Sequence, residues 1–116
     1  MTHVAVLICG AGPVGLVAGL CLARAGIETL VIDKASTVSD DFRASTFHPP
    51  TLEMLDELGL TQDLIAQGLV SPNWQIRQHE SHNKAQFDLS VLGDDTRYPF
   101  RLQCEQRVLT RLADAK

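Results

Sequence analysis

Three glycines near the N-terminus have the spacing of a loop that binds phosphate groups. Gly10, Gly12 and Gly15 form the pattern G-x-G-x-x-G, and Gly19 follows one helical turn later. In such a loop the first glycine permits a tight turn, the second lets the backbone approach a pyrophosphate, and the third lets a helix pack closely on a strand. The phosphates would lie at the helix N-terminus, where free N–H groups and the helix dipole favour negative charge.

The residues around the glycines predict the strands and the helix that such a loop requires. Residues 4–9 are a short apolar run, typical of a parallel strand buried on both faces. Residues 13–25 have a helical pattern that is apolar nearly all round, which indicates a helix buried on most sides, and Gly26 fits the left-handed position after it. Residues 28–32 form a second apolar strand. We therefore predict an α/β fold with a Rossmann-like βαβ unit and a right-handed crossover.

An acidic residue stands where a nucleotide ribose would be recognised. Asp33 follows the second predicted strand, and its carboxylate can accept hydrogen bonds from a ribose diol. The same carboxylate would repel a 2′-phosphate, so the pattern favours NAD or FAD over NADP. Lys34 could approach the adenosine. The alternative is a βα turn that serves packing alone.

The segment after Asp33 differs from a simple NAD-binding domain, in which a helix and a third parallel strand soon follow. Residues 34–46 predict a long polar loop with little periodicity. This loop contains Arg43, whose guanidinium could return to the pyrophosphate or to the ribityl chain of a longer cofactor. The organisation therefore leaves room for FAD as well as NAD.

The rest of the chain predicts two short helices, antiparallel strands and a final helix. Pro49 and Pro50 suit the first positions of a helix, and Thr61 would cap the second one. Apolar and polar residues then alternate through Leu89 and Val91, which predicts half-buried antiparallel strands. The whole chain is predicted to be the N-terminal part of one domain over 1–116, with the βαβ unit and two helices at 1–70, the antiparallel strands at 71–102 and a helix at 103–116.

The composition excludes several classes of partner. The chain has 116 residues and a formal net charge of −4, which gives no basic surface for nucleic acid or for anionic membranes. No apolar run reaches membrane-spanning length, and no secretory signal is recognisable. Cys9, Cys21 and Cys104 lie in apolar or helical patterns, so we expect reduced, packed thiols in a cytoplasmic protein, without disulfides or metal ligands.

Two further stretches complete a resemblance to a known family. Together with residues 8–35, the stretches FRASTFHPPTLEMLDELGL (42–60) and YPFRLQCEQRVLTRLADA (98–115) resemble the N-terminal part of FAD-dependent aromatic-ring monooxygenases of the p-hydroxybenzoate hydroxylase and phenol hydroxylase type. The resemblance covers nearly the whole chain and rests on three motifs in the same order. Family members run to several hundred residues, so the resemblance implies an FAD-binding segment only, with no catalytic residue assigned.

The resemblance also implies a role for each candidate site residue. The glycine loop would bind the FAD pyrophosphate through backbone N–H groups, and Asp33 would take the adenosine ribose. Arg43 matches the family's arginine beside the pyrophosphate and the ribityl chain. Gln106 matches a glutamine that touches the ribityl chain or the flavin edge, with Gln103 as the alternative. The full set is Gly10, Ala11, Gly12, Pro13, Val14, Gly15, Asp33, Lys34, Arg43 and Gln106, with no metal ligand.

The whole protein is then expected to be a flavoprotein monooxygenase. NAD(P)H would reduce FAD, and the reaction with O₂ would hydroxylate an aromatic substrate. Two other hypotheses stay open at this point: an NAD-dependent oxidoreductase built on the same βαβ unit, and a non-catalytic remnant that binds nucleotide. FAD binding without NAD binding would distinguish the flavoprotein monooxygenase from the NAD-dependent oxidoreductase.

Overall fold

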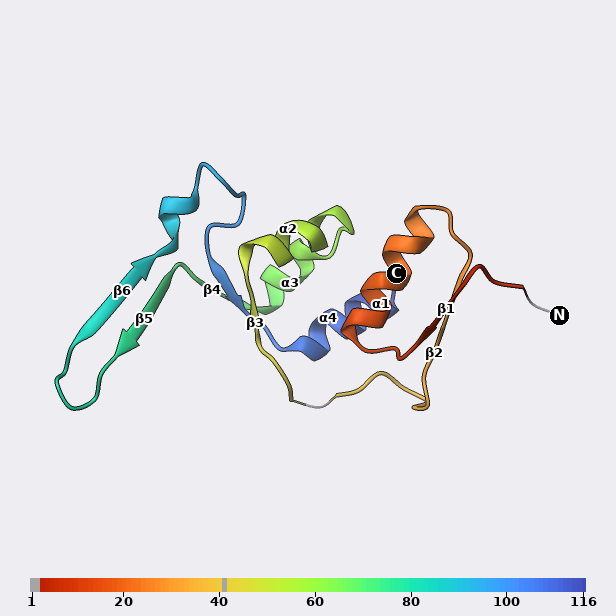
Figure 1. Ribbon diagram of the computed structural model, residues 1–116, viewed down its shortest axis with the longest axis horizontal. Coiled ribbons are helices and arrows are strands. Elements are labelled where there is room, and N and C mark those ends of the chain that lie inside the picture. Colours follow the sequence, from red (N-terminus) through yellow and green to blue (C-terminus); the bar gives the residue numbers. More distant parts are fainter. Residues whose placement is uncertain (1–2, 41) are drawn as a thin grey trace. The chain divides into compact units, whose positions relative to one another are not determined.

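The computed structural model describes residues 3–40 and 42–116 and has a mixed α/β architecture (Figure 1). The chain divides into two units: unit 1 comprises residues 1–44 and 105–116, and unit 2 comprises residues 45–104. Each unit contains its own strands and helices. Within the described ranges, no helix combines the length and the apolar character needed to cross a membrane.

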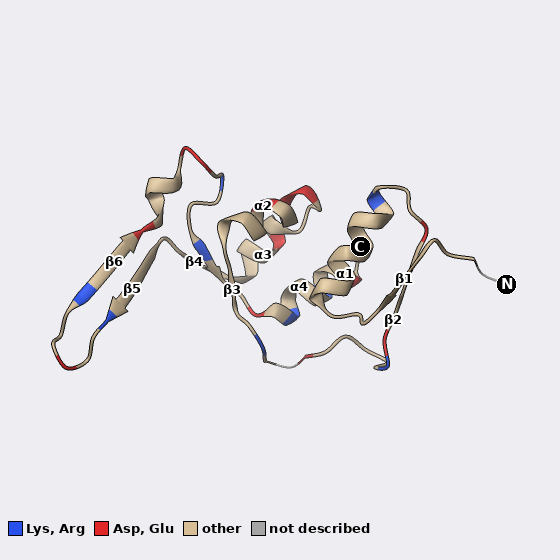
Figure 2. Ribbon diagram, viewed as in Figure 1, with Lys and Arg blue, Asp and Glu red and all other residues tan. Residues whose placement is uncertain are grey.

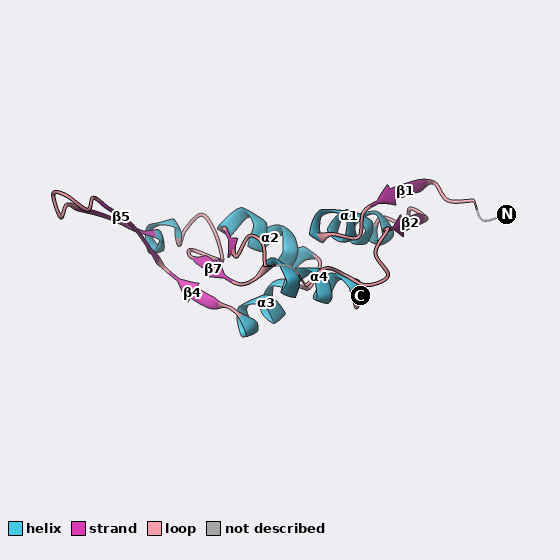
Figure 3. Cartoon of the chain, turned by 90° about the horizontal axis from the view of Figure 1, so that it is seen from below, coloured by secondary structure: helices cyan, strands magenta, loops and turns pink. Residues whose placement is uncertain are grey.

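Unit 1 contains a strand pair and two helices. Strands β1 (Val6–Cys9) and β2 (Thr29–Ile32) pair in parallel and are joined by α1 (Pro13–Arg24). The last helix, α4 (Gln106–Asp114), packs against α1, as Figure 3 shows. The predicted order of strand, helix and strand is confirmed, and Gly26 has the expected left-handed conformation, with φ of 74°.

The strand pair is covered on one face, so the expectation of strands buried on both faces is wrong. Ile8 faces α1 and is half-buried, because glycines in the helix allow a close approach. Side chains of the opposite face are exposed, with Leu7 at 54% and Leu30 at 44%. The helix was also expected to be buried on most sides, but Gly19 is the only buried residue of α1. Only the face of α1 that meets the strands and α4 is covered.

Two of the three cysteines are likewise more exposed than expected. Cys9 lies on the uncovered face of β1 and is exposed, Cys21 in α1 is exposed, and Cys104 is buried. The expectation of packed thiols is therefore confirmed for Cys104 and wrong for the other two. None of the three thiols forms a disulfide in the part of the chain that the structure describes.

Unit 2 has a core made by two helices and a three-stranded sheet. Helices α2 (Pro49–Glu57) and α3 (Thr61–Gln67) pack against each other. In the sheet, β7 (Arg101–Gln103) is central and pairs antiparallel with β3 (Thr46–Phe47) and β4 (Leu69–Ser71). The core side chains are Phe47, Leu52, Leu55, Leu60, Leu64, Tyr98, Leu102 and Cys104.

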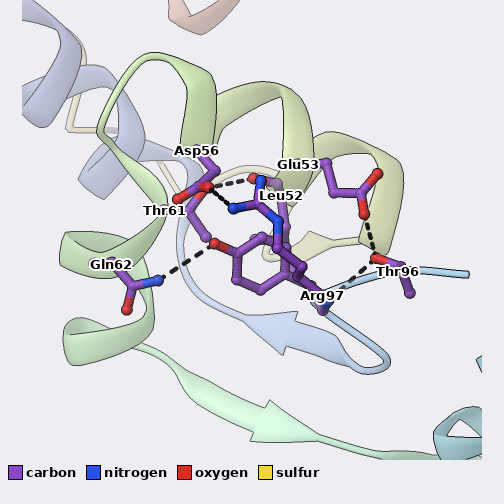
Figure 4. A network of polar contacts seen from close by, with 8 residues as sticks. Leu52, Glu53, Asp56, Thr61, Gln62, Thr96 and Arg97 are labelled. Carbon is purple, nitrogen blue, oxygen red and sulfur yellow. Dashed lines mark hydrogen bonds and ion pairs between the residues drawn. The ribbon is translucent and has the colours of Figure 1, made fainter. Parts of the chain in front are cut away.

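The helix boundaries of unit 2 agree with the sequence, with one correction at Thr61. As predicted, α2 begins at Pro49, and Gly59 follows it with φ of 71°. Thr61 was expected to cap α3, but the cap position is Leu60, which makes no side-chain hydrogen bond. The Thr61 hydroxyl instead donates a hydrogen bond of 2.5 Å to the carbonyl of Leu52 (Figure 4). The fully buried hydroxyl thus has a hydrogen-bond partner, and this bond links α3 to α2.

A β-hairpin forms a separate sheet in unit 2. Strands β5 (Asn73–Arg77) and β6 (Lys84–Asp88) pair antiparallel, which confirms the predicted pairing. The expectation that their apolar side chains are half-buried is wrong, since Trp74, Ile76 and Phe87 are 43%, 53% and 47% exposed. Two strands without a covering layer leave one apolar face accessible.

The predicted strand does not continue past the hairpin. Residues Leu89–Leu92 form a short 3₁₀ helix, η1, where alternation had predicted a strand. The carboxylate of Asp88 accepts a hydrogen bond of 2.9 Å from the N–H of Ser90 and so caps this turn. A local side-chain bond has replaced the pairing that a strand would need.

Candidate functional site

An open cavity of about 630 Å³ lies in unit 1 at the N-terminus of α1. Four segments form its wall: the glycine loop, the end of β2, the polar loop that follows β2, and one face of α4. Figure 2 shows an acidic position directly after β2 and a basic position next to it. The lining residues are Ala11, Gly12, Pro13, Asp33, Lys34, Ala35, Ser36, Thr37, Val38, Ser39, Arg43, Gln106, Arg107, Thr110 and Asp114.

Backbone geometry explains the glycines of the loop. Gly10 has φ of +117°, a conformation that residues with a side chain rarely adopt. A Cβ on Gly15 would lie 1.9 Å from the Gly10 carbonyl oxygen, so α1 can start here only because residue 15 lacks a side chain. An added Cβ on Gly12 would meet nothing within 4 Å. Gly12 therefore leaves open space where a ligand can approach the backbone.

Helix α1 begins at this loop without a side-chain cap. Gly12 occupies the cap position, and Pro13, the first helical residue, has no N–H to satisfy. The N–H groups that follow in the first turn have no acceptor within the helix, and that turn contains no acidic residue. Free donors and the positive end of the helix dipole make this a place where an anion is stabilised.

The Asp33 carboxylate is held by backbone groups on two sides. Its Oδ1 accepts a hydrogen bond of 2.8 Å from the N–H of Ala35, and its Oδ2 accepts one of 2.7 Å from the N–H of Ala11. These bonds, first that of Ala35 and then that of Ala11, lower the pKa of Asp33 below its ordinary value of 3.8, with a smaller contribution from the charge of Lys34. The ionised carboxylate keeps acceptor capacity for hydroxyl groups of a ligand.

The segment that carries Arg43 is fixed to α4 on both sides of this residue. The Arg107 guanidinium lies 4.6 Å from the centroid of the Phe42 ring, a cation–π contact. The N–H of Gln106 donates a hydrogen bond of 3.0 Å to the carbonyl of Ala44. Arg43 lies between these two anchored neighbours and lines the cavity. Helix α4 therefore positions the arginine that the sequence had singled out.

The two glutamines considered from the sequence have different surroundings. Gln106 is the first residue of α4 and lines the cavity of unit 1. Gln103 is in β7 of unit 2, where its Oε1 accepts a hydrogen bond of 3.2 Å from the hydroxyl of Thr46. The side chain of Gln103 thus has a partner within its own sheet.

Most of the predicted site residues come together in this one cavity. Gly10 lines a smaller pocket, which shares Asp33 and Lys34 with the main cavity. Val14 and Gly15 line neither pocket, since Val14 is 81% exposed and Gly15 packs against the loop backbone. The predicted residues that line the main cavity are Ala11, Gly12, Pro13, Asp33, Lys34, Arg43 and Gln106.

The cavity also contains residues that the sequence had not singled out. Thr110 and Asp114 follow Gln106 at intervals of four, so all three lie on one face of α4. The Thr110 hydroxyl donates a hydrogen bond of 3.1 Å to the carbonyl of Gln106. Arg107 adds a positive charge and forms an ion pair with Glu105. The helical spacing from Gln106 was the signal that could have identified the first two.

Comparison with known proteins gives the family. The family model described as an FAD binding domain matches residues 3–115. The chain is 39% identical over 107 residues to the 6-hydroxy-3-succinoylpyridine 3-monooxygenase HspB of Pseudomonas putida, covering 92% of this chain and 27% of that protein. It is 39% identical over 97 residues to the para-nitrophenol 4-monooxygenase of a Pseudomonas species, covering 84% of this chain and 24% of the relative.

A solved structure agrees with this match. The crystal structure of the p-nitrophenol 4-monooxygenase PnpA from Pseudomonas putida superposes with a TM-score of 0.86 at 34% identity, over 95% of this chain and 28% of that one. The chain thus spans about a quarter of the length of the relatives it matches. The family resemblance stated from the sequence is confirmed. The chain belongs to the FAD-binding domain family of the flavin-dependent aromatic monooxygenases.

Proposed function

We propose that this chain binds FAD in the cavity of unit 1 and supplies part of the cofactor site of an aromatic-ring monooxygenase. In this proposal β1, α1 and β2 act as a Rossmann-like unit. The loop from Gly10 to Gly15 binds the pyrophosphate, and Asp33 binds the adenosine ribose with Lys34 close to the adenosine. Arg43 and Gln106 contact the pyrophosphate and the ribityl chain.

The observation that carries the proposal is that Asp33, Arg43 and Gln106 line one cavity although they come from three separate segments. Its volume of about 630 Å³ is in the range of small-molecule sites. The uncapped end of α1 and the Asp33 carboxylate are sufficient to bind an ADP group, through its phosphates and its ribose. The two further polar side chains extend the site toward a longer cofactor, which supports FAD over NAD.

The donors and acceptors of the cavity also fit an unphosphorylated ribose. Asp33 is ionised, and a 2′-phosphate beside it would meet a like charge. The first turn of α1 offers backbone donors to the pyrophosphate and carries no competing acid. The open space at Gly12 allows the close approach that these hydrogen bonds require.

The activity of the whole protein is part of the proposal. Bound FAD would accept electrons from NAD(P)H and use O₂ to hydroxylate an aromatic substrate, and this chain would bind and orient the cofactor. HspB and the para-nitrophenol monooxygenase are named for aromatic substrates, which supports an aromatic substrate class here as well. A cytoplasmic location, inferred from the odd number of cysteines, stays a prediction.

A titration of the purified chain with FAD tests the proposal. Flavin fluorescence would follow binding, NAD would be the competitor, and circular dichroism would monitor the fold. We expect saturable FAD binding that NAD does not displace. Displacement of FAD by NAD at similar concentrations would instead support an NAD-dependent oxidoreductase, and a folded chain that binds neither would support a remnant without cofactor.

Matched variants assign the binding to the cavity. Arg43→Ala and Gln106→Ala should each weaken FAD binding and leave the circular dichroism spectrum unchanged. Arg77→Ala removes the same charge as Arg43→Ala from the exposed hairpin of unit 2 and should bind FAD like the parent. Equal affinity of all three variants would show that FAD binds elsewhere.

A further inference from the structure

The loop that follows β2 is attached to α4 by two side-chain contacts in matching order. The Asp40 carboxylate forms an ion pair with the Arg111 guanidinium, and the Phe42 ring contacts Arg107. The partners are two residues apart in the loop and four residues apart in the helix. Two residues of extended chain span about 6.6 Å, and four helical residues span about 6 Å. This part of the loop therefore runs antiparallel to α4 with matching spacing.

The ion pair attaches one wall of the cavity in unit 1. Residues 36–39, which precede Asp40, line this cavity. They belong to neither a helix nor a strand, so no regular ladder of backbone hydrogen bonds fixes them. At the start of this segment the N–H of Ala35 donates a hydrogen bond of 2.8 Å to Asp33, and at its end Asp40 is paired with Arg111. The position of the wall therefore depends on contacts at both ends.

The ion pair itself lies outside the cavity. Ser39 and Thr110 line the cavity, whereas their neighbours Asp40 and Arg111 do not. The side chains of Asp40 and Arg111 are 63% and 53% exposed. An effect of this pair on a ligand in the cavity is therefore transmitted by the wall or by long-range charge, and these two routes can be separated by experiment.

We propose that Asp40 and Arg111 are a positioning pair for the cofactor. Their ion pair holds residues 36–39 beside α4 in the position that fits FAD, and it raises the affinity for FAD without contact between the pair and the ligand. This inference rests on the proposed function, because the ligand is the FAD of the cavity in unit 1. An exposed ion pair contributes modestly, so its loss should weaken FAD binding by about two- to fivefold.

Two single variants separate positioning from long-range charge. Arg111→Ala removes a positive charge, and Asp40→Ala removes a negative charge. Because the pyrophosphate of FAD is anionic, charge alone predicts weaker binding by the first variant and tighter binding by the second. A positioning pair predicts weaker binding by both, since each substitution breaks the same contact. Titrations followed by flavin fluorescence measure both affinities, and the difference from the parent should shrink at high salt, which screens an exposed pair.

Double variants measure the coupling between the two side chains. Asp40→Ala/Arg111→Ala should bind FAD no worse than either single variant, because the contact can be lost only once. The exchanged pair Asp40→Arg/Arg111→Asp keeps the net charge of the parent and should restore its affinity to within about twofold. Two controls in unit 2 should bind FAD like the parent: Arg97→Ala, which breaks an ion pair with Asp56, and Asp94→Ala in an exposed turn.

Three results in variants that are folded by circular dichroism would overturn the proposal. These are parental affinity in both single variants, tighter FAD binding by Asp40→Ala, and an exchanged pair that binds as weakly as the single variants. A parent chain that does not bind FAD would overturn the proposed function and this inference with it. Failure of the inference alone is distinguishable, because the parent then binds FAD and only the variants depart from expectation.

Discussion

The carboxylate of Asp33 accepts a hydrogen bond of 2.7 Å from the backbone N–H of Ala11, which ties the end of β2 to the glycine loop after β1. The residue proposed to recognise the ribose therefore also holds the loop proposed to bind the pyrophosphate. Since the N–H of Ala11 already has an acceptor within the protein, the donors left for phosphate are those that follow it in the loop and in the first turn of α1.

This double role predicts an effect of Asp33→Ala on ligands that have no ribose diol. Hydrogen bonds to a charged group are stronger than those between neutral groups, so FAD binding should weaken by about tenfold or more. Binding of 2′,3′-dideoxy-ADP should weaken as well, because the loop loses its anchor. Titration calorimetry with ADP and its dideoxy analogue checks this. Asp94→Ala, in an exposed turn of unit 2, is the control. If the dideoxy analogue binds the variant and the parent equally, Asp33 acts on the ribose alone.

Substitutions of the loop glycines should separate effects on the free energy of unfolding from effects on FAD binding. Gly15→Ala places a Cβ 1.9 Å from the Gly10 carbonyl oxygen and should destabilise the chain by about 3 kcal/mol or more. Gly12→Ala meets no atom within 4 Å and should leave the free energy of unfolding within about 0.5 kcal/mol of the parent. The same Gly12 variant should lose FAD affinity by roughly tenfold, because its methyl group occupies the space proposed for the pyrophosphate. Urea denaturation and FAD titration of both variants check the pair.

The contact between Phe42 and Arg107 should act on FAD through Arg43. An exposed cation–π contact contributes about 0.5–1 kcal/mol, so Phe42→Leu should weaken FAD binding by about two- to fivefold. If Phe42 serves to position Arg43, the double variant Phe42→Leu/Arg43→Ala should bind FAD no worse than Arg43→Ala alone. Additive losses would mean that Phe42 contributes independently. Phe87→Leu on the hairpin is the matched control.

Features that depend on local spacing could be predicted from the sequence. The close approach of Gly15 to the Gly10 carbonyl follows from the G-x-G-x-x-G pattern, because the spacing fixes where the helix must start. The pairing of Trp74 with Phe87 across the hairpin follows from period-two alternation on both sides of a polar turn. In both cases the determining residues lie close together in the chain.

Features that depend on distant neighbours could not be predicted. An apolar strand residue such as Leu7 looks the same in the sequence whether or not a layer covers it, so its exposure was missed. The bond from Ala11 to Asp33 joins residues 22 positions apart and requires the parallel pairing of β1 and β2. A threonine before an apolar run usually caps a helix, but here the buried Thr61 found a carbonyl in α2 instead.

Mutation of Thr61 can distinguish its hydrogen bond to α2 from a role as a helix cap. Thr61→Val keeps the shape but removes the hydroxyl that donates to the Leu52 carbonyl, which should cost about 1 kcal/mol. Thr61→Asp should cost more, because the site is fully buried and a carboxylate cannot donate to that carbonyl. Since aspartate is a good helix cap, a capping role would give the opposite order. Urea denaturation of the two variants at neutral pH decides between the two roles.

Tyr98 should make unit 2 less stable at alkaline pH. Burial, and next to it the hydrogen bond and charge of Asp56, raise the pKa of the Tyr98 phenol above its ordinary value of 10.0. In the unfolded chain the phenol ionises near 10, whereas in the folded chain it stays protonated. The stabilisation is therefore complete below pH 10 and is lost as the pH rises through the folded pKa, with a slope of at most about 1.4 kcal/mol per pH unit.

Tyr98→Phe should abolish this loss, so above pH 10 the free energy of unfolding of the parent falls relative to that of the variant. Because Tyr98 is the only tyrosine of the chain, absorbance of the ionised phenol gives its titration in the folded protein directly. Urea denaturation at several alkaline pH values gives the free energy of unfolding for the same samples. An absorbance midpoint at or below 10, or an equal pH slope in the Phe variant, would mean that the environment of Tyr98 does not disfavour its ionisation.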